Sequence, residues 1–227
     1  LRHGPDRHAA RHRGFCMSAL ATRWHLLRHA RPLVAQGICY GQSDMPADTQ
    51  ATQQAAQSFV EYLYGLQGQN ALSAAPHVLL QCSPLRRCQQ LAQVLGPLLQ
   101  ARGMQVATQT EPHIAELDFG AWEGQPWSSI SPAQWLAWTS DFAHYQPGGG
   151  ESTAALLRRV RLAAQTSQQL LARQPHTQIV WVTHAGVMRA LHWMQHHPTL
   201  DAPQQASQWP QDGACGYGLW LTEPQTP

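Results

Sequence analysis

The stretch "WHLLRHARPLVAQGICYGQSD", residues 24–44, decides the fold class and the chemistry expected of this chain. Its first part, "WHLLRH", is a short apolar run of the kind that forms a buried strand. The run ends in Arg28 and His29, and a turn-rich loop follows instead of more strand. A buried strand ordinarily ends in turn residues of no chemical interest, so a cationic pair at this position needs a chemical reason.

Two further apolar runs end in the same way. They are "HVLLQCS", residues 77–83, and "TQIVWVTH", residues 177–184. The polar residues at or just after the three strand ends are Arg28, His29, Ser83, Arg86, Arg87, Thr183 and His184. In an open parallel sheet, ligands bind in the crevice beyond the carboxyl ends of the strands, so we expect these side chains to meet in one cleft. Cationic residues there cost folding energy unless an anion satisfies them, which predicts a bound phosphate or carboxylate.

The pairing of arginine with histidine favours phosphate chemistry. A guanidinium matches phosphate oxygens in bidentate geometry and keeps its proton. An imidazole, with an ordinary pKa of about 6.5, is available near pH 7 as a neutral nucleophile or as a hydrogen-bond donor. The sequence contains no metal-ligand cluster, so we expect arginines and a protonated histidine to supply the positive charge that phosphoryl transfer needs.

Strands and helices are expected to alternate along the chain. Helices are predicted at residues 50–64, at about 85–101 with Pro97 as a possible break, from Ser131 as cap, from the glycines at 148–150 to just before Pro175, and from Val187. A further strand is predicted at 104–109 and an edge strand at 216–223. This order predicts an α/β fold with a mainly parallel sheet and helices on both faces.

Composition places residues 17–227 in one globular domain and excludes several classes of protein. The chain has 227 residues, of which 43% are hydrophobic, and no lysine, so a lysine-dependent mechanism is excluded. Its net charge of +2 comes from residues 1–16, which we expect to be a flexible extension or an upstream translation artefact, because Met17 would make a natural start. The remainder holds eleven arginines against twelve acidic residues and has no electrostatic footprint for nucleic acid.

The cysteines and the hydropathy pattern suggest a soluble, cytoplasmic protein. The five cysteines are scattered, without a CxxC pair, as suits reduced thiols better than disulfides or a zinc site. No apolar run approaches the length of a membrane span, and the polar N-terminus lacks the apolar core of a signal peptide. Cys39 and Cys82 are expected to be small buried fillers, and His25 to pack on the sheet face opposite Leu26.

Five motifs in order resemble the histidine phosphatase superfamily, in its phosphoglycerate-mutase-like branch. They are "LLRHA", "SPLRRCQQLA", "ELDFGAWEG", "PGGGES" and "VTHAGV", and the similarity spans roughly residues 22–222. The resemblance implies a three-layer αβα fold with a small helical cap and a phosphohistidine mechanism without metal or cofactor. It implies His29 as nucleophile and a phosphate pocket formed by Arg28, Arg87 and His184, with Arg86 facing outward. Substrate contacts are also expected from Gly41, Gln42 and Ala185.

The same resemblance implies Glu116 as the general acid, and Glu123 is the competing carboxylate with a more structural role. The chain departs from the family pattern after the nucleophile. Ala30 stands where the family usually has glycine, and Arg31 and Pro32 stand where a glutamate and an asparagine commonly follow. The "RHG" at residues 2–4 has no strand before it, and we interpret it as a decoy.

The loop "GICYGQSDMPAD" looks most like α-ribazole phosphatases, which act in assembly of the cobalamin nucleotide loop. Residues 117–150 contain no arginine or lysine, so hydrolysis is favoured over the mutase reaction. Trp122, Trp127, Trp135 and Trp138 in this segment suit either a bulky substrate or a core. The predicted partner is therefore a small-molecule phosphomonoester, with no nucleic acid and no membrane.

Several alternatives stay open at this stage. They are a broad-specificity small-molecule phosphatase, a phosphoglycerate-mutase-like enzyme, a phosphoprotein phosphatase and a non-catalytic phosphate-binding module. His192 and His196 share a helix face and could resemble metal ligands, but with no acidic or thiol companion nearby a solvated helix end is the better interpretation. The sequence leaves the oligomeric state open, a homodimer included, and does not identify the residues that would contact a nucleoside.

Overall fold

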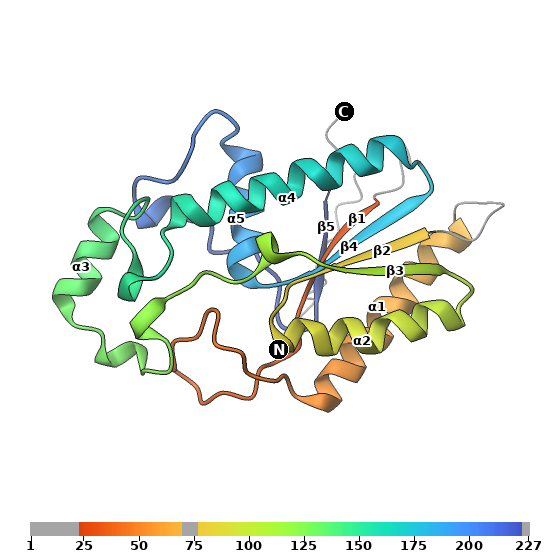
Figure 1. Ribbon diagram of the computed structural model, residues 1–227, viewed down its shortest axis with the longest axis horizontal. Coiled ribbons are helices and arrows are strands. Elements are labelled where there is room, and N and C mark those ends of the chain that lie inside the picture. The colour runs from red at the N-terminus through yellow and green to blue at the C-terminus, as the bar shows by residue number, and fades with distance from the viewer. Residues whose placement is uncertain (1–22, 70–76, 224–227) are drawn as a thin grey trace, which may run out of the picture.

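The computed structural model describes residues 23–69 and 77–223, and a five-stranded sheet forms its centre (Figure 1). The strands are β1 (Trp24–Arg28), β2 (His77–Cys82), β3 (Gln105–Thr110), β4 (Thr177–Thr183) and β5 (Trp220–Glu223). Their order in the sheet is β3-β2-β4-β1-β5. The first four are parallel to one another, and β5 pairs with β1 in the antiparallel sense.

Helices cover both faces of the sheet. The helices are α1 (Thr49–Gln69), α2 (Arg86–Ala101), α3 (Pro132–Ser140), α4 (Thr153–Arg173) and α5 (Ala185–His196). Helices α1 and α2 pack on one face and α4 and α5 on the other, while α3 lies beyond the end of the sheet (Figure 1). The predicted α/β fold, with a mainly parallel sheet between two helical layers and a small helical cap, is confirmed.

Alternation along the buried strands divides the core into two halves. In β1, Leu26 faces α4 and α5, whereas Leu27 faces α1 and α2. In β4, Trp181 and Val182 divide in the same way. Successive side chains of a strand point to opposite faces, so a strand covered on both sides reads as a continuous apolar run. Burial of each large apolar side chain contributes about 1.5–3 kcal/mol, which fixes the register that places the strand ends together.

The helix ends follow local sequence signals more closely than the helix interiors. Ser131 caps α3 in a capping box with Gln134, and Ser152 caps α4. Helix α2 continues through Pro97, because buried leucines on either side of the proline hold the helix against the sheet. Helix α1 extends beyond the predicted residue 64, and α5 begins two residues before Val187.

The cap, residues 117–150, lies beyond the carboxyl ends of β1, β2 and β4 (Figure 1). Trp122 and Ile130 are buried in a small core of its own together with Cys39. At its base the chain crosses itself at Gly120 and Gly148, both of which have positive φ. A Cβ on Gly120 would lie 2.4 Å from the backbone oxygen of Gly148, so this crossing requires glycine. The "PGGG" motif therefore anchors the cap to the segment that carries Glu116.

Some predictions fall outside the described residues, and others are met within them. The proposed extension at residues 1–16, the alternative start at Met17 and the "RHG" at 2–4 lie outside the described ranges. Cys39 and Cys82 are buried, as predicted. Across residues 23–69 and 77–223, no helix has both the length and the apolar character needed to cross a membrane.

Candidate active site

Two histidines lie side by side where the central strands end. His29 directly follows β1 and His184 directly follows β4, and these strands pair with Arg28 opposite Thr183. The backbone N–H of His29 donates to the Thr183 oxygen at 3.1 Å, and the two imidazole centroids are 5.0 Å apart. Both side chains are buried, with 2% and 0% exposure. The parallel register thus brings together two residues that lie 155 positions apart in the sequence.

The surroundings of His29 fix its protonation. Its Nδ1 lies 2.7 Å from the backbone oxygen of Ala30, and because a carbonyl oxygen only accepts, Nδ1 carries the proton. Burial, followed by the positive charge of Arg87, lowers the pKa of His29 to about 3. The ring is therefore neutral near pH 7, and its Nε2 holds a free lone pair. This is the state that a histidine nucleophile requires.

Two guanidinium groups are close enough to His29 for their charges to lower its pKa. Arg87, fully buried in the first turn of α2, donates from Nη1 to the Ser43 oxygen at 2.9 Å and from Nη2 to the Gly41 oxygen at 2.5 Å. Arg28 donates from Nη1 to the Cys215 oxygen at 2.9 Å. Within the described ranges, the Nε atoms of both arginines are buried without a hydrogen-bond partner, and neither side chain pairs with a carboxylate. The site thus keeps unused donors and positive charge for an anion.

Arg86, the neighbour of Arg87, is exposed, as expected from the sequence. Its backbone N–H donates to the Asp44 carboxylate at 2.6 Å. The two adjacent arginines therefore have different surroundings, and only Arg87 lies in the site.

Two tyrosines that sequence reasoning missed cover the arginines. The Arg28 guanidinium lies 4.0 Å from the ring centroid of Tyr217, and that of Arg87 lies 5.6 Å from the ring centroid of Tyr40. The two hydroxyl groups are 2.5 Å apart. The pair joins the loop after β1 to the segment before β5, and no sequence pattern connects residues 177 positions apart.

His184 contacts Ser83 and is also neutral in this structure. Its Nε2 lies 2.7 Å from the Ser83 hydroxyl oxygen. Burial, and then the neighbouring His29 ring and the positive charge of Arg87, which disfavour a second charged imidazole, lower the pKa of His184 well below its ordinary value. The expectation that a protonated histidine adds positive charge is therefore not met here, and Arg28 and Arg87 carry the charge. A bound phosphate would act in the opposite direction and favour the protonated ring.

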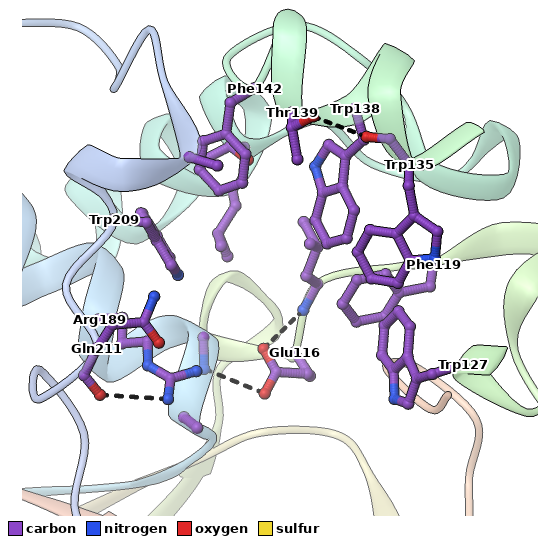
Figure 2. Close-up of a pocket in the computed structure, with 16 residues that line it drawn as sticks. Glu116, Phe119, Trp127, Trp135, Trp138, Thr139, Phe142, Arg189, Trp209 and Gln211 are labelled. Carbon is purple, nitrogen blue, oxygen red and sulfur yellow. Dashed lines mark hydrogen bonds between the residues drawn. The ribbon is translucent and has the colours of Figure 1, made fainter. Parts of the chain in front are cut away.

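Glu116 contacts the first turn of α5 and borders the cavity drawn in Figure 2. Its carboxylate accepts hydrogen bonds from the backbone N–H groups of Leu117 at 2.9 Å and Gly186 at 3.2 Å. A Cβ on Gly186 would lie 2.1 Å from the Glu116 carboxylate. The glycine of the "VTHAGV" motif therefore makes room for this carboxylate at the helix N-terminus, where negative charge is favoured.

Arg159 of α4 holds the segment that carries Glu116. It forms an ion pair with Glu151, with Nε 2.7 Å from the carboxylate, and donates to the backbone oxygens of His113, Ala115 and Glu116 at 2.6 to 3.0 Å. Sequence reasoning missed this arginine. Glu151 in "PGGGES" was the available signal, since it stands eight positions before Arg159.

Glu123, the competing carboxylate, binds backbone instead of facing the histidines. It accepts from the backbone N–H groups of Gln42 at 2.8 Å and Phe119 at 3.0 Å, and from Ser43. These bonds lower the pKa of Glu123, against the effect of its burial. The structural interpretation of Glu123 thus fits its contacts.

Three residues predicted to touch substrate have different surroundings. The Gly41 oxygen accepts from Arg87, and the Gln42 side chain donates to the Glu116 backbone oxygen at 3.1 Å. Ala185 lines a cavity beside Glu116. Gly41 and Gln42 therefore connect the loop after β1 to the charged residues of the site.

The cavity beside Glu116 has a volume of about 350 Å³, and several aromatic side chains line it (Figure 2). Its aromatic lining consists of Phe119, Trp127, Trp135, Trp138, Phe142 and Trp209. Trp122 is buried in the cap instead, so the two interpretations of the tryptophans apply to different members of the set. Trp209, which follows α5, was not singled out from the sequence.

No metal site accompanies these groups in the part of the chain that the structure describes. There, no three or more histidine, cysteine, aspartate or glutamate side chains are placed to bind one ion. His192 and His196 contact each other on α5, with ring centroids 4.2 Å apart.

Comparisons with known proteins agree with this geometry. The family model of the histidine phosphatase superfamily (branch 1) matches residues 24–215. A mycobacterial glucosyl-3-phosphoglycerate phosphatase is 26% identical over 87% of each chain, with a TM-score of 0.62. The protein TTHB049 from Thermus thermophilus is 25% identical over 87% of this chain and 90% of its own, with a TM-score of 0.52. No curated protein matches the chain. The chain therefore belongs to the histidine phosphatase superfamily, branch 1, and is a phosphoric monoester hydrolase, as its motifs predicted.

Proposed function

We propose that this protein is a metal-independent phosphomonoesterase that works through a phosphohistidine at His29. One observation carries the proposal. His29 is buried and neutral with its Nε2 lone pair available, and Arg87 and Arg28 are close enough for their charges to lower its pKa, while the Nε atoms of both arginines have no partner among the described residues. A phosphate that enters this site would satisfy both arginines and meet the nucleophile.

In the first half of the proposed reaction, the lone pair of His29 Nε2 attacks phosphorus and the bond from phosphorus to the ester oxygen breaks. The two arginines neutralise charge on the phosphoryl oxygens, and His184 donates a hydrogen bond once the phosphate has raised its pKa. Glu116, in its protonated form, gives its proton to the departing alkoxide. The products are an alcohol and phosphorylated His29.

In the second half, water attacks the phosphohistidine. Glu116, now a carboxylate, takes a proton from this water, and the bond between phosphorus and nitrogen breaks with its electrons returning to His29. Inorganic phosphate leaves, and both residues regain their starting protonation. The close approach of Glu116 to Gly186 supports this role, because it holds the carboxylate at the border of the cavity.

The cavity beside Glu116 suits the alcohol part of the substrate, and α-ribazole 5′-phosphate is the finer proposal. The resemblance of the "GICYGQSDMPAD" loop supports it, as do aromatic walls that can stack on a benzimidazole ring. A second candidate is glucosyl-3-phosphoglycerate, after which the structurally similar mycobacterial phosphatase is named. The lack of arginine and lysine at 117–150 favours hydrolysis over a mutase reaction.

Phosphate release tests the proposal. The substrates are α-ribazole 5′-phosphate, glucosyl-3-phosphoglycerate, 3-phosphoglycerate and a panel of simple monoesters, with a chelator present, for the wild type and His29→Ala. We expect kcat/KM to be highest for α-ribazole 5′-phosphate and turnover to be lost in the variant. Equal rates across the panel that depend on His29 would support the phosphohistidine mechanism but contradict the proposed specificity for α-ribazole 5′-phosphate. Activity that survives His29→Ala would overturn the mechanism itself.

A further inference from the structure

Arg189 is the one cationic side chain among the described residues that line the cavity beside Glu116. It lies on α5, one turn after Gly186, and Figure 2 shows it on the same side of the cavity as Glu116. Its Nη2 reaches the backbone oxygen of Gln211 at 3.5 Å, which is at the limit of hydrogen bonding. Its Nε is buried without a hydrogen-bond partner in the described ranges. Arg189 therefore has donors that the protein itself leaves unused.

The other charged group in the cavity does not use them. The Glu116 carboxylate accepts from the backbone N–H groups of Leu117 and Gly186, and no ion pair between it and Arg189 is present among the described residues. A buried guanidinium N–H without an acceptor costs free energy in apolar surroundings. A ligand that brings a hydrogen-bond acceptor into the cavity would therefore satisfy Arg189.

The aromatic wall opposite restricts the shape of that ligand. The rings of Trp135 and Trp138 are stacked, with centroids 5.5 Å apart and planes 28° apart. Those of Trp138 and Phe142 are 5.8 Å apart with planes 19° apart. Three nearly parallel rings in a row present a wall on which a flat ring packs well, and Figure 2 shows Arg189 across the cavity from them.

We propose that Arg189 determines specificity by binding a hydrogen-bond acceptor on the alcohol part of the substrate. The substrate class is a phosphomonoester whose alcohol carries a flat ring and, on that ring, a ring nitrogen or a carboxylate that receives an Arg189 N–H. This inference rests on the proposed phosphatase function and adds to it the group that the enzyme recognises beyond the phosphate. A ligand with a cationic ring is disfavoured, because it would face the guanidinium.

Matched probe substrates test the proposal. 2-Naphthylmethyl phosphate offers the ring alone, the isomers of quinolinylmethyl phosphate place one ring nitrogen at each position, and carboxynaphthylmethyl phosphates add an anion. We expect at least one acceptor-bearing probe to exceed the naphthyl ester in kcat/KM by about 10- to 100-fold, the effect of one hydrogen bond to a charged group. Preference for the nitrogen or the carboxylate probes then distinguishes the two acceptors.

The variant Arg189→Met keeps an apolar stem and removes the donors. We expect it to lose the preference among probes, because kcat/KM falls about 10- to 100-fold for the favoured acceptor-bearing probe and much less for the naphthyl ester. Arg158→Met, the same change at an exposed position of α4, should retain the preference. Retention of the preference in Arg189→Met, or an equal loss for every probe, would overturn the proposal.

A binding measurement separates this proposal from the proposed function. Phosphonate analogues of the same probes cannot be hydrolysed, and quenching of tryptophan fluorescence reports their binding in the wild type and in Arg189→Met. If no probe is turned over in a His29-dependent way, the phosphatase proposal fails. A preference for acceptor-bearing analogues that Arg189→Met removes would still support the role of Arg189, and equal binding of all analogues by the wild type would contradict it.

Discussion

Burial decides the charge of the histidines at the centre of this molecule. His29 and His184 lie against each other and against two arginines, and burial is the largest cause of the lowered pKa of each ring. A charged imidazole in such a place costs more than a neutral one. The proposed nucleophile, His29, is therefore neutral, and the positive charge is on arginines, which cannot lose their protons.

NMR titration of the ring resonances tests this charge state. Between pH 8 and pH 5 we expect His29 and His184 to keep the shifts of neutral imidazole, because the pKa of His29 is about 3 and that of His184 is well below its ordinary value. N-acetylhistidine in the same tube serves as the reference, and single variants assign the peaks. Protonation of either ring with a midpoint near 6.5 would contradict the account.

The two carboxylates of the "ELDFGAWEG" motif are expected to differ in their effect on catalysis. Glu116→Gln removes the proposed acid and should lower kcat/KM, which reports the phosphorylation half of the reaction, by about 10²- to 10⁴-fold for alkyl phosphates and by less for p-nitrophenyl phosphate, whose alcohol leaves without protonation. Glu123→Gln leaves Glu116 in place and weakens the hydrogen bonds from Gln42 and Ser43, so it should lower thermal stability more than kcat. A reversed pattern would assign the acid to Glu123.

Some residues of the site can be predicted from the local sequence, and others cannot. Arg28, His29 and His184 could be predicted, because each follows an apolar run that can only be a buried strand. The contacts of Tyr40 with Tyr217 and of Arg159 with the Glu116 segment could not, since they depend on how loops distant in sequence pack together. The neutrality of His184 was missed for a related reason: burial is a property of the fold.

At the level of single elements, the start of α5 connects the sheet to the proposed chemistry. Its first turn follows His184 and gives a backbone N–H to Glu116 at a distance that only glycine at position 186 permits. The helix therefore holds Glu116, the proposed acid, beside the turn that follows His184.

Gly186→Ala tests this arrangement. The added Cβ would lie 2.1 Å from the Glu116 carboxylate and displace it, so we expect kcat to fall by about 10²-fold or more with the fold retained. Gly96→Ala is the matched control, because its Cβ would meet nothing closer than Leu80 at 4.0 Å, and alanine within a helix should stabilise by about 0.5–1 kcal/mol. Unchanged kcat in Gly186→Ala would show that the position of this carboxylate does not matter.

Element ends and interiors differed in how well the sequence predicted them. Ser131 carries a capping signal, and α3 begins where it predicts. Helix α4 was predicted to open at the glycines 148–150 and begins later, at Thr153 after the Ser152 cap. The continuation of α2 through Pro97 could not be predicted. The sequence shows only that proline destabilises a helix interior, whereas the packing against the sheet that outweighs this effect depends on the fold. The division of the cap tryptophans between core and cavity also depends on tertiary packing.

At the scale of the whole molecule, buried neutral histidines make stability depend on pH. His25 packs against Phe59 and Tyr62, far from the chemistry, and its Nε2 lies 2.9 Å from the Gln178 side-chain oxygen. Burial lowers its pKa from 6.5 to about 4. Between pH 6.5 and pH 4, His25 is therefore protonated in the unfolded chain and neutral in the folded protein. Over this range the free energy of unfolding falls as the pH is lowered.

Urea unfolding between pH 8 and pH 4 measures this contribution. We expect the wild type to lose about 3 kcal/mol more than His25→Gln over that range, at about 1.4 kcal/mol for each unit of lowered pKa. Glutamine keeps an N–H for Gln178 and does not titrate. The difference between the two slopes is the readout, and parallel curves would show that His25 is protonated in the folded protein.

The central claim, that His29 carries the phosphoryl group, is tested most directly by trapping the intermediate. Radiolabelled p-nitrophenyl phosphate, whose alcohol leaves without protonation, is mixed with wild type, Glu116→Gln and His29→Ala, quenched in base within milliseconds, and mapped by peptide mass spectrometry. The account predicts label on His29 in the wild type and more of it in Glu116→Gln, where water attack is slowed, and none in His29→Ala. Label on another residue, or turnover with no phosphorylated enzyme at any time, would contradict it.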